Sequence, residues 1–121
     1  MSTIRVDNFG PSAGGTTYSA RCIAKAWVNF NGTGTIAARD SENVSSLVDL
    51  QTGFTEVNVS SAFAAVDYTG SAFSASGTVF SNYFEGLFFC KNTGTYFTLS
   101  HWQGTFSDLA FVGSSVFGDL A

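Results

Sequence analysis

The sequence is poor in charge, and its positive residues do not cluster. Charged residues make up 12% of the 121 positions, and the net charge at pH 7 is −4, whereas about a quarter of an average domain is charged. Binding to a phosphate backbone needs clustered lysine and arginine, so we expect no nucleic-acid partner. The cations, which stand apart from one another, are Arg5, Arg21, Lys25, Arg39 and Lys91.

Histidine, cysteine and long apolar runs are also scarce. The single histidine is His101, and the two cysteines, Cys22 and Cys90, lie far apart in the sequence. A zinc site needs several such ligands at short spacing, so we expect no metal and no other cofactor. A disulfide is one alternative for the cysteines, but residues 1–10 carry no apolar signal segment, so we expect free thiols in a reducing cytoplasm. No apolar run reaches the roughly 18 residues of a membrane span, and we expect no membrane contact.

Motifs of catalysis are equally hard to find. The nine carboxylates stand singly, and His101 has no Gly-x-Ser-x-Gly elbow or comparable nucleophile beside it. The glycines precede no predicted helix, so they indicate turns and bulges, not a phosphate loop. Two strands can bring any two carboxylates together, which leaves a glycosidase pair open, although such enzymes usually need a larger scaffold. We therefore expect a protein without enzymatic activity.

Aromatic residues, by contrast, are abundant. They make up 16% of the chain, with 13 Phe beside 13 Gly and one Pro. This composition argues against disorder and is typical of a compact β protein. It also provides more apolar surface than a small core needs, and such a surplus often ends in a subunit interface.

Alternating apolar residues predict strands from position 22 onward. Ala26, Val28 and Phe30 share one face, and the segment 31–34 is a strong turn signal. Short strands about ten residues apart predict an all-β fold, a compact β-sandwich or jelly-roll-like domain over residues 21–121. Residues 60–67 are the one expected helical turn. The further strands are expected near 36–41, 44–50, 55–60, 68–74, 78–83, 84–91, 96–102, 109–112 and 115–117.

Two of these strands have a predicted facing. In the strand at 44–50, one face is expected to hold Val44, Ser46, Val48 and Leu50. In the strand at 55–60, Thr55, Val57 and Val59 share a face and the residues between them face the opposite side. The second strand is therefore expected to be half exposed.

Residues 1–20 differ from the rest of the chain. Residues 5–7 suit a short extended piece, and residues 8–15 contain the glycine and proline of a loop. Such a segment cannot build a core, so we predict an N-terminal arm that gains order on a neighbouring molecule. Its predicted docking residues are Ile4, Val6 and Phe9. A frayed terminus is the alternative.

Aromatic residues gather between positions 80 and 102. In the strand expected at 84–91, one face holds Phe84 and Phe88, and the other holds Leu87 and Phe89. A strand that is apolar on both faces is usually buried on both, whereas a single small sandwich leaves one face wet. The arm, a loop and another subunit are the alternative covers, and we favour another subunit. The predicted self-association residues are Phe84, Leu87, Phe88, Phe89, Tyr96, Phe97 and Trp102.

Residues 24–46 carry a resemblance to a known family. They contain KAWVNFNGTGT at positions 25–35, followed by RDSENVSS at positions 39–46. This stretch resembles a motif of tail-fibre-like and other virion structural proteins of tailed bacteriophages, many of them marine or infecting cyanobacteria. The similarity continues at residues 52–59 and is looser at residues 62–68 and 115–119, and residues 2–8 resemble the short N-terminal tag common in such proteins.

The resemblance implies a virion protein that is made in the host bacterial cytoplasm and assembles as a homotrimer about a threefold axis. The family has no known catalytic residues to transfer. Trp27, Phe30, Asn31 and Gly32 match the motif, which implies a structural role for them, as an aromatic strand ending in a tight turn. Fibre members often carry a longer shaft before this domain, so both a compact knob on a short fibre or tail and a capsid decoration protein are open.

Three functions are compatible with these observations. The first is a tail or short-fibre assembly and host-attachment module, whose arm docks on another virion protein and whose loops face the host, where a surface glycan is a candidate partner. Its affinity would come from multivalency. The second is a capsid decoration, or cement, protein that stabilises the head. The third is a carbohydrate-binding module, which requires an exposed aromatic platform.

Overall fold

The computed structural model describes residues 2–76 and 84–121 and shows an all-β protein, as predicted. Every strand pair in these residues is antiparallel. The one helical piece within the described part of the chain is the 3-10 turn η1 (Ala20–Cys22). The strand expected at 78–83 lies outside the described residues.

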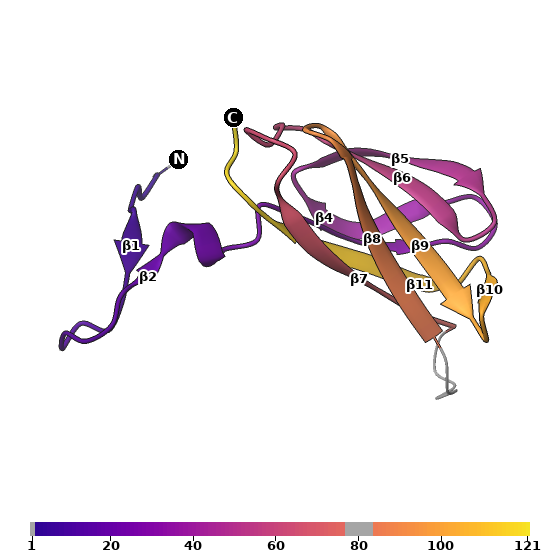
Figure 1. Ribbon diagram of the computed structural model, residues 1–121, viewed down its shortest axis with the longest axis horizontal. Helices are drawn as coiled ribbons and strands as arrows, with labels where there is room; N and C mark the ends of the chain where they lie inside the picture. The colour runs from indigo at the N-terminus through magenta and orange to yellow at the C-terminus, as the bar shows by residue number, and fades with distance from the viewer. Residues whose placement is uncertain (1, 77–83) are drawn as a thin grey trace.

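Two larger sheets make up the body of the molecule (Figure 1). The four-stranded sheet has the order β4-β3-β11-β7, formed by β4 (Ala37–Glu42), β3 (Ala26–Asn31), β11 (Phe111–Phe117) and β7 (Thr69–Ala75). The five-stranded sheet has the order β10-β9-β6-β5, and β8 also pairs with β9. Its strands are β10 (Thr105–Phe106), β9 (Thr95–Trp102), β6 (Phe54–Val59), β5 (Val44–Gln51) and β8 (Phe84–Asn92).

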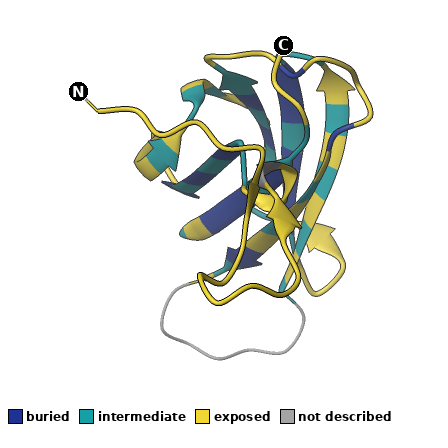
Figure 2. Ribbon diagram, turned by 90° about the vertical axis from the view of Figure 1, so that its left-hand side faces the viewer, coloured by how far each residue is buried: buried dark blue, intermediate teal, exposed yellow. Residues whose placement is uncertain are grey.

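The core lies between these two sheets, which both contribute to it (Figure 2). The predicted alternation in β3 is confirmed, because Ala26, Val28 and Phe30 are buried while the residues between them are half-buried. From the five-stranded sheet, Val57 and Tyr96 enter the same cluster and are fully buried. The hydroxyl of Tyr96 lies 2.9 Å from Oγ of Ser114 on β11, and this buried hydrogen bond joins the sheets.

The predicted facing of β5 is wrong, whereas that of β6 is confirmed. The pairing of β5 with β6 shifts register twice, between Val44 and Ser46 and again between Asp49 and Gln51. Each β-bulge adds a residue and reverses the side-chain alternation that follows it. As a result Leu47 packs against the core, and Val48 is 40% exposed.

The segment 60–67 forms no helix, so the predicted helical turn is wrong. Phe63 forms a bridge to Leu120, and its ring stacks on that of Tyr68 with centroids 4.2 Å apart. An isolated turn of helix is unstable by itself, and burial of Phe63 in the core favours the extended path. The two strands expected at 109–112 and 115–117 are one strand, β11.

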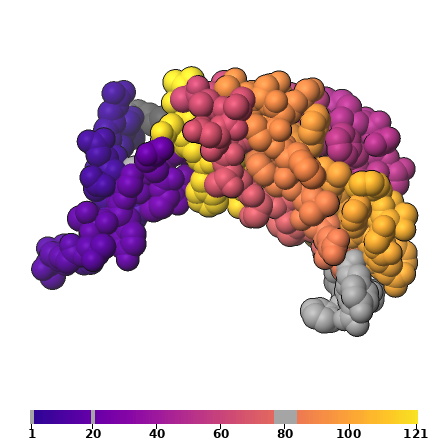
Figure 3. Space-filling view, in the orientation of Figure 1, coloured from indigo at the N-terminus to yellow at the C-terminus, as the bar shows by residue number. Residues whose placement is uncertain are grey.

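The N-terminal segment, residues 2–19, lies outside the core. Its only described pairing is a hairpin of β1 (Asn8–Phe9) with β2 (Tyr18–Ser19), in a part expected to be loop. Every residue of the segment is exposed. Just after this segment, an ion pair of 2.8 Å between Arg21 and Asp119 joins the chain to its own C-terminal end. In Figures 1 and 3 the segment projects beside the end of β11 as a separate lobe.

The two sheets meet differently at their two sides. At the closed edge, formed by β7 and β8, a Cβ on Gly86 would lie 2.5 Å from the backbone nitrogen of Phe73. There the hydroxyl of Ser74 also donates to the carbonyl of Glu85 over 2.7 Å. At the open edge, β4 and β5 are the end strands of their sheets. They are joined at Asn43, whose φ of 54° turns the chain from one sheet to the other.

Candidate functional site

The candidate site is the outer face of the five-stranded sheet, and β8 shows why it is unusual. Phe84 and Phe88 on the inner face of β8 pack against the core. Leu87 and Phe89 point the opposite way and are 38% and 53% exposed. The prediction that β8 is apolar on both faces is therefore confirmed, and within the described residues its outer face is open to solvent.

The outer face continues from β8 onto β9 and β6. Leu87 pairs with Leu99, and Phe89 pairs with Phe97. On the other side of β9, Phe54 pairs with Leu99, and its ring lies 5.0 Å from that of Phe97. We call this set the apolar face; its members are Phe54, Leu87, Phe89, Phe97 and Leu99. Leu99 is only 6% exposed because its neighbours surround it.

One end of the apolar face carries a further exposed aromatic residue, Phe106 on β10, which is 45% exposed and pairs with His101. Trp102 at the end of β9 is 44% exposed, but it pairs with Phe84 and so lies on the opposite face of the sheet. The ring of Phe106 packs edge-on against His101 with centroids 4.2 Å apart. Nδ1 of His101 lies 3.6 Å from Oε2 of Glu85. His101 thus lies at the border of the apolar face.

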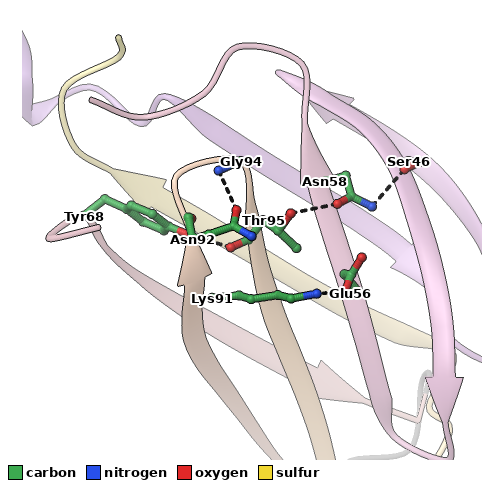
Figure 4. Close-up of polar contacts among 8 residues, drawn as sticks. All are labelled: Ser46, Glu56, Asn58, Tyr68, Lys91, Asn92, Gly94 and Thr95. Atoms are coloured by element: carbon green, nitrogen blue, oxygen red, sulfur yellow. Dashed lines mark hydrogen bonds and ion pairs between the residues drawn. The ribbon is translucent and has the colours of Figure 1, made fainter. Parts of the chain in front are cut away.

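The opposite end of the apolar face is polar, and its groups bind one another (Figure 4). Nζ of Lys91 lies 2.7 Å from Oε2 of Glu56, and this hydrogen bond is the main cause that lowers the pKa of Glu56. The hydroxyl of Thr95 donates to Oδ1 of Asn58, whose amide donates to Ser46. These polar groups are partnered, so they form a satisfied rim to the apolar face.

Tyr68 contributes to the same end from inside the molecule. Its hydroxyl donates to the carbonyl oxygens of Asn92 and Thr95, which lie 2.7 Å and 2.8 Å away. Figure 4 shows this ring reaching the turn between β8 and β9. Burial is the largest cause that raises the pKa of Tyr68. Tyr68 therefore holds the turn in place and offers its hydroxyl to no outside partner.

The structure separates the seven predicted self-association residues into two groups. Leu87, Phe89 and Phe97 lie on the apolar face, whereas Trp102 is exposed at the end of β9 on the opposite face of the sheet. Phe84 and Phe88 face inward and are half-buried against the chain's own core. Tyr96 is 0% exposed, and burial raises its pKa to about 12. Its assignment to an intersubunit contact is corrected, because its ring and hydroxyl are used within the chain.

Two members of the apolar face, Phe54 and Leu99, were not among the predicted residues. Leu99 lies an even number of positions from Phe97 in the strand expected at 96–102, so the alternation already placed both on one face. Phe54 precedes the strand expected at 55–60 and carried no such signal. Only the pairing of β6 with β9 brings it beside Phe97.

The three predicted docking residues are exposed, but they do not form one unit. Ile4 and Val6 are 88% and 52% exposed in the stretch before β1. Phe9 belongs to the hairpin, where its ring lies 6.3 Å from that of Tyr18. The extended part and the hairpin of the N-terminal segment are therefore distinct.

Residues 27–32, which match the motif, form most of β3 and the start of the tight turn that follows it. Phe30 is fully buried, and Trp27 is half-buried on the opposite face of β3. Oδ1 of Asn31 accepts hydrogen bonds from the backbone nitrogen and the hydroxyl of Thr33, which forms a tight turn. A Cβ on Gly32 would lie 2.9 Å from the carbonyl oxygen of Leu109, to which its own nitrogen donates.

Three further properties bear on the candidate site: metal binding, membrane insertion and similarity to known proteins. Within residues 2–76 and 84–121, no cluster of three or more His, Cys, Asp or Glu side chains is arranged to hold a metal ion. The same residues include no helix with the length and apolar character needed to cross a bilayer. Comparison of the chain with protein families, with curated proteins and with solved structures gave no match.

Proposed function

We propose that this chain is a non-enzymatic structural protein of a tailed bacteriophage particle, and that it assembles with copies of itself through the apolar face. The observation that carries the proposal is the outward exposure of Leu87 and Phe89 beside Phe97 and Leu99. A contiguous apolar patch of this kind marks an interaction surface. Leu87 and Phe89 are already partly covered, so burying the remainder of each contributes about half of the 1.5–3 kcal/mol for a fully exposed side chain, and several together can drive association.

In this proposal the two sheets are the layers of a compact β-sandwich or jelly-roll-like domain, with residues 1–20 as its arm. Three copies surround a threefold axis, as the resemblance of residues 24–46 implies. A closed ring of identical subunits covers the same patch on each copy and leaves no apolar face open. The virion location depends on the same resemblance and is tested separately below.

A sugar-binding role is less well supported by the surface. Phe89, Trp102 and Phe106 are exposed, which a glycan platform requires. A sugar also needs free polar groups beside the aromatic rings, because its hydroxyls must replace their bonds to water. The polar groups at one end of the face, Lys91, Glu56, Asn58 and Thr95, already bind one another. The apolar face therefore fits a protein surface better than a carbohydrate.

The self-association part of the proposal is tested by measuring the molar mass of the chain with light scattering at increasing protein concentration. We expect an oligomer, and we expect Phe89→Ser to weaken association about tenfold or more because it removes a central aromatic contact. Phe73→Ser is the matched control. Phe73 is 50% exposed, as Phe89 nearly is, but it belongs to β7 in the other sheet. An unaltered chain that stays monomeric at millimolar concentration would contradict the proposal.

The location is tested by counting copies of the chain in purified particles with quantitative mass spectrometry. A few to dozens of copies support the tail or short-fibre attachment module. Hundreds of copies support the capsid decoration protein. Both are structural roles for the same assembly, and absence of the chain from intact particles would refute both.

A further inference from the structure

The open edge contains an apolar groove that the proposed function does not use. The groove has a volume of about 190 Å³ and lies between β4 and β5. Ile36, Val44 and Leu47 at its base pack against the core. Its lining residues are Ile36, Ala38, Ser41, Val44, Ser45, Ser46 and Leu47.

The strands that flank the groove have free backbone edges. β4 pairs with β3 and β5 pairs with β6, and in the described part of the chain no strand pairs with their other sides. An edge of this kind presents unpaired N–H and C=O groups, to which a further strand can bind. The free backbone and the apolar groove together define a site for an extended segment with alternating apolar residues.

The chain itself contains a segment with this pattern. In residues 2–7, Ile4 and Val6 alternate with Thr3, Arg5 and Asp7. In an extended strand the first two side chains point to one side and the other three to the opposite side. Ile4 is 88% exposed, and Val6 is 52% exposed.

Charge complementarity places this segment on β4. Asp40 and Glu42 pair with Asn29 and Trp27, so they lie on the outer face of the four-stranded sheet. When Ile4 and Val6 enter the groove, Arg5 points to that same outer face, beside these carboxylates. The cation of β4 itself, Arg39, is already bound to the carbonyl of Ala110 and packs over the ring of Phe111 at 4.2 Å.

The position of the segment points to a second copy as its donor. The hairpin at 8–19 and the Arg21–Asp119 ion pair hold the start of the chain beside the C-terminal end of β11. In Figure 1 residues 2–7 lie with this hairpin in the separate lobe, outside the two sheets.

We propose that residues 2–7 of one copy add as an antiparallel strand to the free edge of β4 in a second copy, with Ile4 and Val6 in the groove and Arg5 beside Asp40. The inference rests on the proposed self-association and names a second contact within it. Because the donor and acceptor surfaces differ, the contact is heterologous, and it closes a ring when each copy donates to the next.

Mixing of two cysteine variants tests this strand exchange directly. Cys22 is exposed, so both full-length chains first carry Cys22→Ser. In an antiparallel strand with Arg5 beside Asp40, and with Arg39 as the bulged residue of β4, Val6 lies beside Ala38. One chain therefore carries Val6→Cys and the other Ala38→Cys, and the mixture is oxidised mildly and separated without reductant. We expect a disulfide-linked heterodimer, since strand pairing brings Cα atoms within the 4.4–6.8 Å range that a disulfide needs.

The matched control replaces Ala38→Cys by Ala37→Cys. Ala37 is the neighbouring exposed residue of β4, but it does not line the groove. We expect at least fivefold less cross-linking with Ala37→Cys, because its side chain points away from Val6. Equal cross-linking of the two positions would overturn the proposal.

A charge exchange provides a second test on the full chain. We expect Arg5→Glu and Asp40→Arg each to weaken association two- to fivefold, the range of exposed ion pairs. The double variant should regain the affinity of the unaltered chain. Failure of the double variant to recover overturns the predicted register.

The outcomes separate this inference from the proposed function. An oligomeric unaltered chain without the Val6–Ala38 cross-link overturns strand exchange and leaves assembly through the apolar face standing. A cross-link that forms within one chain, seen when both cysteines are in the same monomer, shows that the segment fills its own groove and also overturns exchange. A monomeric unaltered chain overturns both proposals.

Discussion

The two edges of the molecule bring the same two sheets together in different ways. At the closed edge, β7 and β8 approach so closely that Gly86 has no room for a Cβ. At the open edge, β4 and β5 separate beyond Asn43 and leave a groove lined partly by core residues. A missing side chain thus closes one side of this two-sheet protein, while the opposite side stays open.

The strands at the two edges explain the difference. Gly86 replaces a side chain at an inner position of β8, between Phe84 and Phe88, and lets the backbone of β7 approach. At the open edge, β5 carries two β-bulges, and bulges bend a strand and increase its twist. The bulged strand therefore diverges from β4 instead of packing along it.

The largest effect is expected from Gly86→Ala at the closed edge. The new methyl carbon would lie 2.5 Å from the nitrogen of Phe73 and 2.6 Å from the carbonyl of Ala72. These are backbone atoms that cannot rotate away, so we expect a loss of about 3 kcal/mol in the free energy of unfolding, measured with urea. Gly94→Ala is the control, because its Cβ would meet only Oδ1 of Asn92 at 3.7 Å. Equal stability of the two variants would show that the closed edge can separate.

A smaller effect is expected from alkaline pH, which acts on the core between the two edges. Burial raises the pKa of Tyr96 from 10.0 to about 12. The folded chain thus keeps a proton that the unfolded chain loses. Stability is fully present below about pH 10 and falls as pH rises through about 12, by roughly 2–3 kcal/mol for Tyr96 alone.

Urea unfolding between pH 8 and 12 measures this dependence. Tyr96→Phe is the control, since it removes the titrating hydroxyl and its hydrogen bond to Ser114. We expect the variant to start about 1 kcal/mol less stable and to lose less stability at high pH. Parallel curves for the two proteins would show that Tyr96 does not titrate differently in the folded state.

The smallest effect is expected from Ala38→Val at the open edge. The two added methyl groups enter the groove, where there is space, so we expect a change within about 0.5 kcal/mol. The measurement is urea unfolding at a protein concentration low enough to keep the chain monomeric. A loss similar to that of Gly86→Ala would mean that the two edges are equally tight and that the contrast between them is wrong.

Local alternation predicted the parts of the fold in which strands run without interruption. β3 has the predicted inner residues Ala26, Val28 and Phe30, and β8 has the predicted apolar residues on both faces. Prediction failed in β5, because a bulge depends on the pairing partner and leaves no clear signal in the strand itself. It also failed for Phe63, where burial in the core outweighed a weak local preference for helix.

The residues of the candidate site also divide into those that local alternation predicted and those that it did not. Leu87 and Phe89 were predicted from alternation, whereas Phe54 joined them only through the pairing of β6 with β9. Tyr96 was predicted at a surface because it is aromatic and lies near other aromatic residues. Its place in the core depends on Ser114, eighteen positions later, which provides the partner for its hydroxyl.

By itself the sequence determined an all-β chain with a surplus of apolar residues, because a two-residue period and glycine-marked turns act over short distances along the chain. The tertiary structure alone decided which edge closes, which residues line the groove, and which aromatic rings stay outside. Those outcomes depend on backbone distances between strands far apart in the sequence, such as the approach of β7 to Gly86. No local pattern records such a distance, because it results from the packing of both sheets at once.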